Sequence, residues 1–383
     1  MATSPAAKLF FLSLGAFAAG AISFGAIGLA PGVANEMQMS SVVAAWLVAS
    51  YALTAALLAP ILALTTPRLA RRTQAVLGLA LLGTGGILCA FAPDFHLLLI
   101  SRAVSGSGAA LFSSSAPAIA ASIVASQRRG RAVSYVSAGM TLGPLVGVPI
   151  AAWASMMLGW RVTFLALSIP ALVAALLLAS SSDANEQVES NAATGQVLKV
   201  VRAIAGHLVR TVGHVGARFA IFAPITGLLV DHYCLNPSHL PVALLVFGIG
   251  GVLGNVLGGQ LTDHLGARST IWMSFVCLLG TFAALLLDVS SFNAVALLSA
   301  SAIVGALFTS SQQVVLLTLV DPEHGRLALG LNTTALAFGM GAGASLGGLI
   351  ADSLGYTALI AGAILLLGIT AMMTTGRSAL MQR

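Results

Sequence analysis

The sequence predicts an all-α integral membrane protein with twelve transmembrane helices, arranged as two six-helix bundles related by pseudo-symmetry. Three observations predict this class. Hydrophobic residues make up 58% of the 383 residues and charged residues only 7%, with a mean hydropathy of +0.99, whereas a soluble domain carries about a quarter charged residues. Apolar runs of membrane-spanning length follow one another along the chain, and the two halves repeat each other's motifs.

The predicted spans are apolar runs bounded by charged or turn residues. A helix rises about 1.5 Å per residue, so about 20 residues cross a hydrocarbon core of about 30 Å. Lipid satisfies no backbone polar group and the runs are too long for barrel strands, so each run must be a helix. The first run is also too long for a signal-peptide core. The spans lie near residues 9–30, 42–64, 74–92, 97–123, 132–153, 162–180, 208–230, 240–261, 269–288, 293–319, 327–350 and 356–375.

Basic residues are distributed unevenly between the connecting segments. If the N-terminus is cytoplasmic, 14 of the 17 basic residues fall in cytoplasmic segments. Because bacterial membrane proteins keep Lys and Arg on the cytoplasmic side, we expect an inner-membrane, multi-pass protein with both termini cytoplasmic. The 14 residues are Lys8, Arg68, Arg71, Arg72, Arg128, Arg129, Arg131, Lys199, Arg202, Arg210, Arg268, Arg326, Arg377 and Arg383. The net charge of +6 is attributed to these loops and to anionic lipid, and no nucleic-acid partner is expected.

A polar stretch between the sixth and seventh spans divides the chain into related halves. We expect an N-terminal bundle over 1–181, a cytoplasmic linker over 182–206 and a C-terminal bundle over 207–383. The repeat is visible where Ala110–Ser115 matches Ala306–Ser311. Gly143 and Gly147 likewise match Gly343 and Gly347. Such repeats in transporters place a substrate site between the halves at mid-membrane.

Four motifs stand at fixed places in this topology. The loop after span eight has the form G-x-L-x-D-x-x-G-x-R, whereas the equivalent stretch after span two keeps its arginines but has no aspartate. Span four opens with Arg102 in an R-x-x-x-G-x-G element, and Gly159-Trp160-Arg161 precedes span six. The residues of the loop motif are Gly259, Asp263, Gly266 and Arg268, and those of the span-five motif, G-x-x-x-G-P-x-x-G, are Gly139, Gly143, Pro144 and Gly147.

These motifs, in this order, resemble those of the major facilitator superfamily, specifically its twelve-span drug:proton antiporter and sugar-efflux branch. The resemblance covers essentially the whole chain. It implies a secondary transporter, and the span-five motif implies an antiporter that exports its substrate. For Arg102 it implies a role in proton transfer or gating, and the alternative is a side chain that snorkels to the outer headgroups.

The loop and span-five motifs also have direct physical interpretations. Asp263 can accept from helix-end N–H groups while Arg268 pairs across a gate, which forms a latch; the alternative is ordinary topogenic charge. Glycines four residues apart let helix backbones approach, and Pro144 removes one ladder hydrogen bond and permits bending. The alternative for span five is close packing without a coupling role.

The seventh span carries the most distinctive charges. His207, Arg210, His214 and Arg218 are separated by three, four and four residues and therefore share one helical face. If the span starts near residue 208, Arg218 lies at mid-membrane, where it would attract an anionic substrate group. In the alternative, the span begins later and the stripe is mostly cytoplasmic. We expect this face to line the transport pathway.

The sequence departs from the drug:proton antiporters in its first span. Ser23 stands where those relatives often carry a carboxylate, and none of the 11 acidic residues lies in the interior of a predicted span. Coupling through a buried carboxylate is therefore in doubt. Histidine is the remaining side chain that titrates near neutrality, so His214 is the candidate proton carrier.

A second group of polar residues lies deep in apolar runs and could line a cavity. Hydrogen bonding between helices is the alternative role for each. The residues are Tyr51, Asn255, Gln312, Gln313 and Asn332.

Together these features predict a monomeric secondary active transporter that exports a small organic solute or drug by proton-linked alternating access. The basic face of span seven favours a solute with a carboxylate or phosphate. The alternatives are a uniporter or importer of a small metabolite and a transport-inactive membrane sensor. No catalytic constellation, cofactor motif or metal-ligand spacing is found, so we do not expect an enzyme. The expected partners are the small-molecule substrate, membrane lipids and protons.

Overall fold

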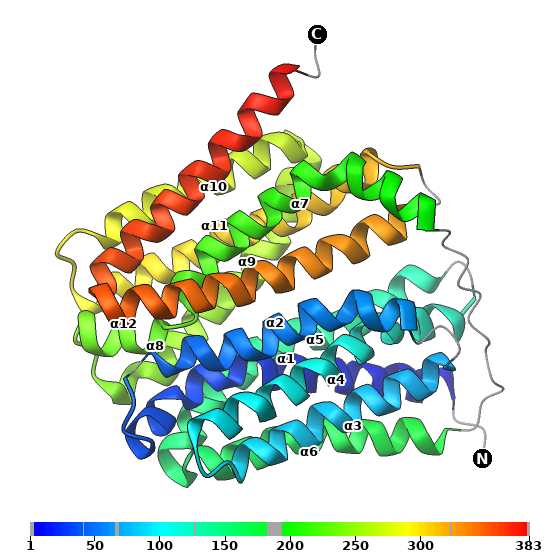
Figure 1. Ribbon diagram of the computed structural model, residues 1–383, viewed down its shortest axis with the longest axis horizontal. Helices are drawn as coiled ribbons and strands as arrows, with labels where there is room; N and C mark the ends of the chain where they lie inside the picture. The colour runs from blue at the N-terminus through cyan, green and yellow to red at the C-terminus, as the bar shows by residue number, and fades with distance from the viewer. Residues whose placement is uncertain are drawn as a thin grey trace. The chain divides into compact units, whose positions relative to one another are not determined.

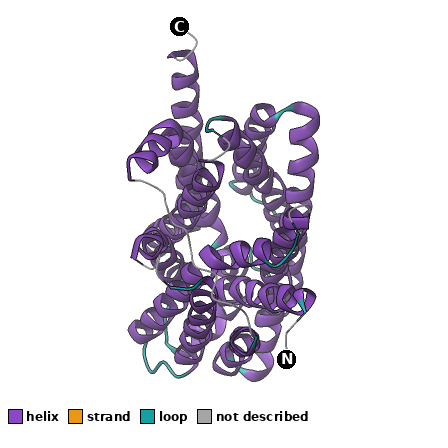
Figure 2. Cartoon of the chain, turned by 90° about the vertical axis from the view of Figure 1, so that its right-hand side faces the viewer, coloured by secondary structure: helices purple, strands orange, loops and turns teal. Residues whose placement is uncertain are grey.

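The computed structural model describes residues 4–40, 42–65, 69–125, 128–181, 194–321 and 324–380. Within these ranges the secondary structure is helical and contains no strand (Figure 2). The chain divides into two compact units, the first formed by Met1–Met39 and Trp46–Ser190, the second by Ser40–Ala45 and Asn191–Arg383. The predicted all-α membrane fold is confirmed.

The first unit contains six helices, apart from residues 43–45 of α2, which group with the second unit. These helices are drawn from blue to green in Figure 1. Two of them begin at side-chain caps: Ser4 Oγ accepts from Ala7 N–H at 3.3 Å, and Asp94 Oδ1 accepts from Leu97 N–H at 2.8 Å. The helices are α1 (Pro5–Glu36), α2 (Val43–Thr65), α3 (Arg71–Ala90), α4 (Phe95–Ser122), α5 (Arg129–Leu158) and α6 (Trp160–Ser180).

The second unit begins with a broken span. Its helix α7 (Thr194–Phe222) is followed by α8 (Ile225–Gly227) and the π-helix η2 (Leu228–His232), and the chain bends there by 46°. Pro224 lies at the break, where its missing N–H and its ring interrupt the helical ladder. The remaining elements are η3 (Pro237–His239), α9 (Leu240–Leu265), α10 (Ala267–Leu285), α11 (Ser291–Thr318) and α12 (Gly325–Leu380).

Helix α12 contains two membrane spans. Gly355 interrupts it with φ 83° and ψ 173°, a backbone conformation that residues with a Cβ rarely adopt. The orange and red arms of α12 meet at this corner in Figure 1. In the described residues, nine helices are long and apolar enough to cross a membrane, or ten if the broken span is included. Counting α2 and the two arms of α12 separately supplies the twelve predicted spans.

The described helices extend beyond some predicted boundaries. Helix α7 begins at Thr194, inside the predicted linker 182–206. The first part of that linker, 182–193, lies outside the described residues. The span predicted over 208–230 therefore belongs to a longer helix that bends at Pro224.

The glycines of span five allow close contact between helix backbones in the first unit. A Cβ atom built on Gly143 of α5 would lie 2.7 Å from the backbone nitrogen of Ala21 in α1, closer than any real Cβ contact. In the second unit, a Cβ atom on Gly343 of α12 would lie 2.7 Å from Gly216 Cα in α7. Pro144 contributes to the first contact, because its Cδ lies 2.9 Å from a Cβ built on Gly20. The two glycine motifs thus pack the same way in the two units.

The same contacts establish which residues of α1 and α7 are equivalent. Gly139 and Gly147 of α5 pack against Ser13 and Ala21 of α1. Their counterparts Gly339 and Gly347 of α12 pack against Val212 and Ala220 of α7. Residues 13 and 21 therefore correspond to residues 212 and 220, and by the same register Gly15 corresponds to His214.

Candidate functional site

Arg102 is completely buried in the first unit, where backbone carbonyl groups surround its guanidinium. Nη1 donates to the carbonyl oxygen of Ile22 at 2.7 Å and Nη2 to that of Ser23 at 2.9 Å, both in α1. Nε donates to the carbonyl oxygen of Leu47 in α2 at 3.0 Å. The side chain does not snorkel to a headgroup, so that alternative is wrong. Arg102 instead joins α4 to α1 and α2.

Tyr51 completes the surroundings of this arginine. Its ring centroid lies 4.7 Å from Cζ of Arg102, a cation–π distance, and its hydroxyl donates to the carbonyl oxygen of Ala19 at 3.4 Å. Ser23 contributes its backbone oxygen to Arg102. None of the acidic side chains that the structure describes is buried. Carbonyl dipoles and an aromatic face therefore stabilise the buried charge in place of a carboxylate.

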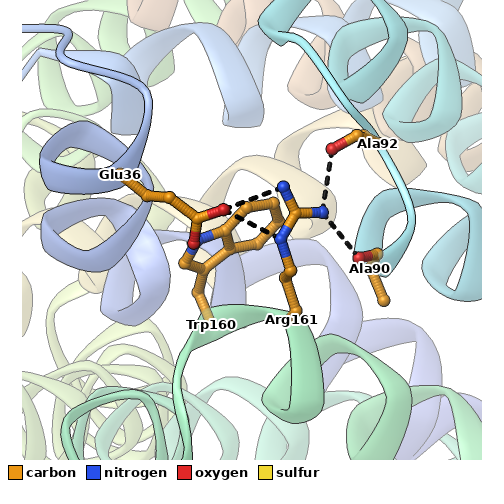
Figure 3. Close-up of polar contacts among 5 residues, drawn as sticks. All are labelled: Glu36, Ala90, Ala92, Trp160 and Arg161. Atoms are coloured by element: carbon orange, nitrogen blue, oxygen red, sulfur yellow. Dashed lines mark hydrogen bonds and ion pairs between the residues drawn. The ribbon is translucent and has the colours of Figure 1, made fainter.

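A second arginine joins three helices at one end of the first unit (Figure 3). Arg161 donates to Glu36 Oε1 at 2.9 Å and to the carbonyl oxygens of Ala90 and Ala92 at 2.8 Å each. Trp160 donates its indole N–H to Glu36 Oε2 at 2.6 Å, and its ring lies 4.2 Å from the guanidinium of Arg161. Gly159, with φ 81°, makes the turn that places both residues there. The Gly-Trp-Arg motif thus ties the ends of α1 and α3 to the start of α6.

The four residues of the α7 basic face, His207, Arg210, His214 and Arg218, have different environments. His207 is partly buried, and its Nδ1 contacts the guanidinium of the equally part-buried Arg210. His214 is completely buried, and the expectation that this face lines the transport pathway stays a prediction. The helical period places the four side chains on one side of α7, but the helices packed there cover them unequally.

His214 lies among aromatic rings of the second unit. Its ring stacks on Phe308 of α11 with centroids 4.0 Å apart and an interplanar angle of 14°. Phe275 of α10 meets it edge-on at 4.9 Å. Nε2 lies 3.1 Å from Oγ of Ser274, whereas Nδ1 is buried and has no hydrogen-bond partner among the described residues. His214 is thus a polar group held in an apolar packing site.

Arg218 lies one turn further along α7 and is only partly buried. Nη1 donates to the carbonyl oxygen of Gly305 in α11 at 3.0 Å. A Cβ atom on Gly305 would lie 2.8 Å from Cδ and 2.9 Å from Cζ of Arg218, so a side chain at this position would require Arg218 to move. A guanidinium carries five N–H donors. In the described residues only one of those of Arg218 is engaged, which leaves donors available to a ligand.

A buried hydrogen-bond network joins α7, α11 and α12. Gln312 Nε2 donates to the carbonyl oxygen of His207 at 2.8 Å and to Thr211 Oγ1 at 3.2 Å. Thr211 Oγ1 lies 2.9 Å from Oδ1 of Asn332. Oε1 of Gln312 is buried without a hydrogen-bond partner in the part of the chain that the structure describes. Gln312 and Asn332 therefore take part in contacts between helices, the alternative role considered for them.

The neighbouring residue Gln313 and the predicted cavity residue Asn255 are both exposed. Successive residues of a helix point about 100° apart, which explains why Gln312 is buried and Gln313 is not. Asn255 of α9 receives a long hydrogen bond from Ser310 Oγ of α11, at 3.4 Å to its Oδ1. Asn255 and Gln313 thus lie on the accessible surface of the second unit.

The loop motif after α9 forms a tight turn. Gly266 ends α9 with φ 83°, as the motif requires of a glycine. Asp263 and Arg268 are exposed, and neither forms an ion pair with a described residue. Gly259 has open space around a built Cβ. The latch assigned to these residues stays a prediction.

Three residues of these sites were missed by sequence reasoning. Ser274 and Thr211 are small hydroxyl residues inside apolar runs, and no spacing distinguishes them from other serines and threonines. Gly305 follows Ala302, Ile303 and Val304, and its contact with Arg218 depends on the packing of α7 against α11. The sequence repeat between the halves, which aligns α11 with α4, was the only feature that could have drawn attention to these positions.

The fold and these sites define a class of protein. Two six-helix units carry buried or half-buried arginines, a buried histidine and amide side chains within membrane spans, and in the described residues no group of three metal-ligating side chains is present. Buried polar groups on repeated helical bundles are typical of secondary transporters. The family model of the Major Facilitator Superfamily matches residues 12–215 and 211–378, and the chain belongs to this superfamily.

Relatives of known sequence are membrane transport proteins rather than enzymes. The inner membrane transport protein YdhP of Escherichia coli (strain K12) is 30% identical over 261 residues, which covers 67% of this chain and 66% of that relative. The uncharacterized MFS-type transporter YtbD of Bacillus subtilis (strain 168) is 27% identical over 98% of this chain and 96% of its own length. A chloramphenicol resistance protein of Streptomyces lividans is 27% identical over 68% of each chain.

Solved structures show the same fold. A bacterial homolog of the human lysosomal transporter Spinster, in an inward-facing and occupied conformation, superposes with a TM-score of 0.79 at 15% identity. The match covers 97% of this chain and 96% of that one. The chain is therefore a multi-pass membrane protein with the major facilitator fold.

Proposed function

We propose that this chain is a secondary active transporter that exports a small organic anion or drug by proton-linked alternating access. The observation that carries the anionic preference is the contrast between its two membrane arginines. Three donor nitrogens of Arg102 are held by carbonyl groups within the first unit. Arg218 is held by one carbonyl group and is partly accessible. A partly accessible guanidinium in a low-dielectric setting binds carboxylate or phosphate through paired hydrogen bonds.

His214 is the proposed proton carrier. No acidic side chain is buried in the described residues, so a carboxylate relay has no candidate there. His214 lies four residues from Arg218 on the same side of α7, so proton binding at His214 and anion binding at Arg218 would influence each other, and exchange requires the two to bind in turn. Proton and anion would then be coupled through one helix.

The remaining polar and gating residues have supporting roles in this proposal. Gln313 and Asn255 are accessible and would contact the substrate, while Gln312, Asn332 and Tyr51 hold helices in position. Asp263 and Arg268, with Gly259 and Gly266, would latch one access state. The close packing of Gly139, Gly143, Pro144 and Gly147 against α1 would let that pair of helices move together.

Export from the cytoplasm is supported by the antiporter-like motif of span five and by the chloramphenicol resistance protein among the relatives. We propose a monomer in a bacterial inner membrane with both termini cytoplasmic, consistent with the basic residues of its loops. The proposed halves are 1–181 and 207–383. An importer, a uniporter and a transport-inactive sensor are the competing functions.

Flux measurements distinguish these functions. The purified chain is reconstituted into liposomes, and radiolabelled chloramphenicol and a set of non-permeant organic anions are tested with and without an imposed pH gradient. Export by proton exchange predicts accumulation in the acidic compartment that stops when the gradient is collapsed. Flux that is indifferent to the gradient indicates a uniporter, and accumulation in the alkaline compartment indicates a proton-coupled importer. The absence of flux for every solute contradicts the proposal.

A further inference from the structure

We propose that Ser274 is a positioning residue that holds His214 in its Nε2–H tautomer and thereby leaves Nδ1 as the atom that takes the transported proton. The inference rests on the proposed role of His214 in coupling. None of the sequence motifs contains Ser274, and none of them indicates which ring nitrogen of His214 carries the proton.

The Ser274 hydroxyl has a single proton to donate. Ser274 Oγ lies 2.7 Å from the carbonyl oxygen of Val304 in α11, and a carbonyl can only accept. The hydroxyl therefore donates to Val304. Its contact with His214 Nε2, at 3.1 Å, then requires the histidine to donate. The proton of the neutral ring lies on Nε2, and Nδ1 carries a lone pair.

Nδ1 of His214 is buried and meets no hydrogen-bond donor among the described residues. A buried acceptor without a partner costs free energy, and a protein retains one where it has a use. The ring also stacks on the face of Phe308 at 4.0 Å, and an aromatic face stabilises an imidazolium as well as a neutral ring. Phe308 would therefore help to stabilise a proton added to the ring.

The ionisable groups around the His214 ring lie on α7, α10 and α12. On α7, Arg210 and Arg218 lie one turn to either side of His214. On α10, Arg268 and Cys277 are exposed, and α11 carries no ionisable side chain. On α12, which packs along α7, Asp352 is exposed. No described acidic group near the ring neutralises an added proton.

The first unit lacks this pair of polar residues at the equivalent positions. Gly15 in α1 is equivalent to His214, and a Cβ there would meet Leu79 and Phe112. Gly78 in α3 takes the place of Ser274. A Cβ built on Gly78 would lie 2.8 Å from the carbonyl oxygen of Gly108 in α4, and Ser274 likewise contacts the carbonyl oxygen of Val304 in α11. The first unit thus has glycine at both positions. His214 and Ser274 occur as a pair in the unit that carries Arg218, and they are absent as a pair from the other.

The tautomer itself can be measured. Full-length protein labelled with ¹⁵N-histidine is reconstituted in lipid, and the His214 signals are identified by subtracting the spectrum of His214→Gln. The wild-type ring should show the Nε2–H tautomer. Ser274→Ala should lower the ratio of Nε2–H to Nδ1–H by about tenfold, since one buried hydrogen bond contributes roughly that factor. Ser274→Thr should restore the ratio, and Ser301→Ala, which removes a hydroxyl bonded within its own helix, should not change it.

Transport provides the second readout. Ser274→Ala should shift the pH profile of gradient-driven flux while Ser274→Thr keeps the wild-type profile. A wild-type Nδ1–H tautomer, or a ratio unchanged in Ser274→Ala, overturns the positioning role whatever the flux. If Ser274→Ala changes the tautomer ratio but neither Ser274→Ala nor His214→Gln changes gradient-driven flux, Ser274 positions His214 and His214 does not couple transport to protons. That result keeps this inference and rejects the coupling role in the proposed function.

Discussion

The carbonyl oxygen of Gly305 in α11 accepts a hydrogen bond of 3.0 Å from Arg218 in α7, and the missing side chain of Gly305 provides the space for that guanidinium. The contact holds a partly accessible cation beside a membrane helix. It connects the packing of the second unit directly to the proposed anion site.

Gly305→Ala should displace Arg218, because the added Cβ would lie 2.8 Å from Cδ of the arginine. We expect little change in the free energy of unfolding, because the clash is with the far end of a flexible side chain that can move, and a clear reduction in anion flux. Gly280→Ala in α10 is the matched control, since no atom lies within 4 Å of its built Cβ. Thermal unfolding in detergent and flux in liposomes measure the two effects. Equal behaviour of the two variants contradicts the contact.

Arg102→Lys should destabilise the first unit more than Arg102→Met does. Lysine keeps the buried charge but lacks the planar fork that reaches three carbonyl groups, and an imperfectly compensated buried charge costs about 3–5 kcal/mol. Methionine removes both the charge and its desolvation cost, and the carbonyl groups keep their helical hydrogen bonds. The free energies of unfolding of the two variants provide the measurement, with the exposed Arg202→Lys as control. A methionine variant that is the less stable of the two contradicts this account.

Arg161→Gln should destabilise the protein more than Glu36→Gln. The ion pair is partly exposed, with side-chain exposures of 35% and 49%, so screening limits its contribution to under about 1 kcal/mol. Arg161 additionally binds the carbonyl oxygens of Ala90 and Ala92, and those bonds survive the loss of Glu36. Melting temperatures compared at low and high salt test this. A larger effect of Glu36→Gln would show that the ion pair dominates.

His214→Gln should separate flux from the pH gradient. The glutamine amide can still donate to Ser274 Oγ but cannot carry a proton at physiological pH. In inverted vesicles, uptake of the substrate should lose its dependence on the gradient while some downhill flux persists. His239→Gln, at an exposed histidine, is the control. If uptake by His214→Gln still depends on the pH gradient, His214 does not couple transport to protons.

Much of the fold could be predicted from the sequence, because hydropathy, loop charge and the repeated glycine motif each constrain the same helices. The break at Pro224 and the start of α7 at Thr194 were not predicted, since an apolar run shows neither where a helix bends nor how far it extends into a polar linker.

The candidate site was less predictable. The helical period grouped His214 with Arg218 on one side of α7, but burial depends on the neighbouring helices, and Phe275 and Phe308 cover His214 while Arg218 stays partly accessible. The carbonyl contacts of Arg102 were equally hidden, because every residue has a carbonyl group and only the three-dimensional packing selects those of Ile22, Ser23 and Leu47.

The most direct test of the central claim compares charged and neutral solutes in one assay. Liposomes containing wild type, Arg218→Gln or the control Arg202→Gln are assayed for gradient-driven uptake of paired solutes, each a carboxylate or phosphate with its neutral amide or alcohol. The account predicts that wild type and control prefer the anionic member of at least one pair. It also predicts that Arg218→Gln lowers the anionic flux at least about tenfold, since a charged hydrogen bond contributes about 1.5–3 kcal/mol. Unchanged anionic flux in a folded Arg218→Gln protein would contradict it.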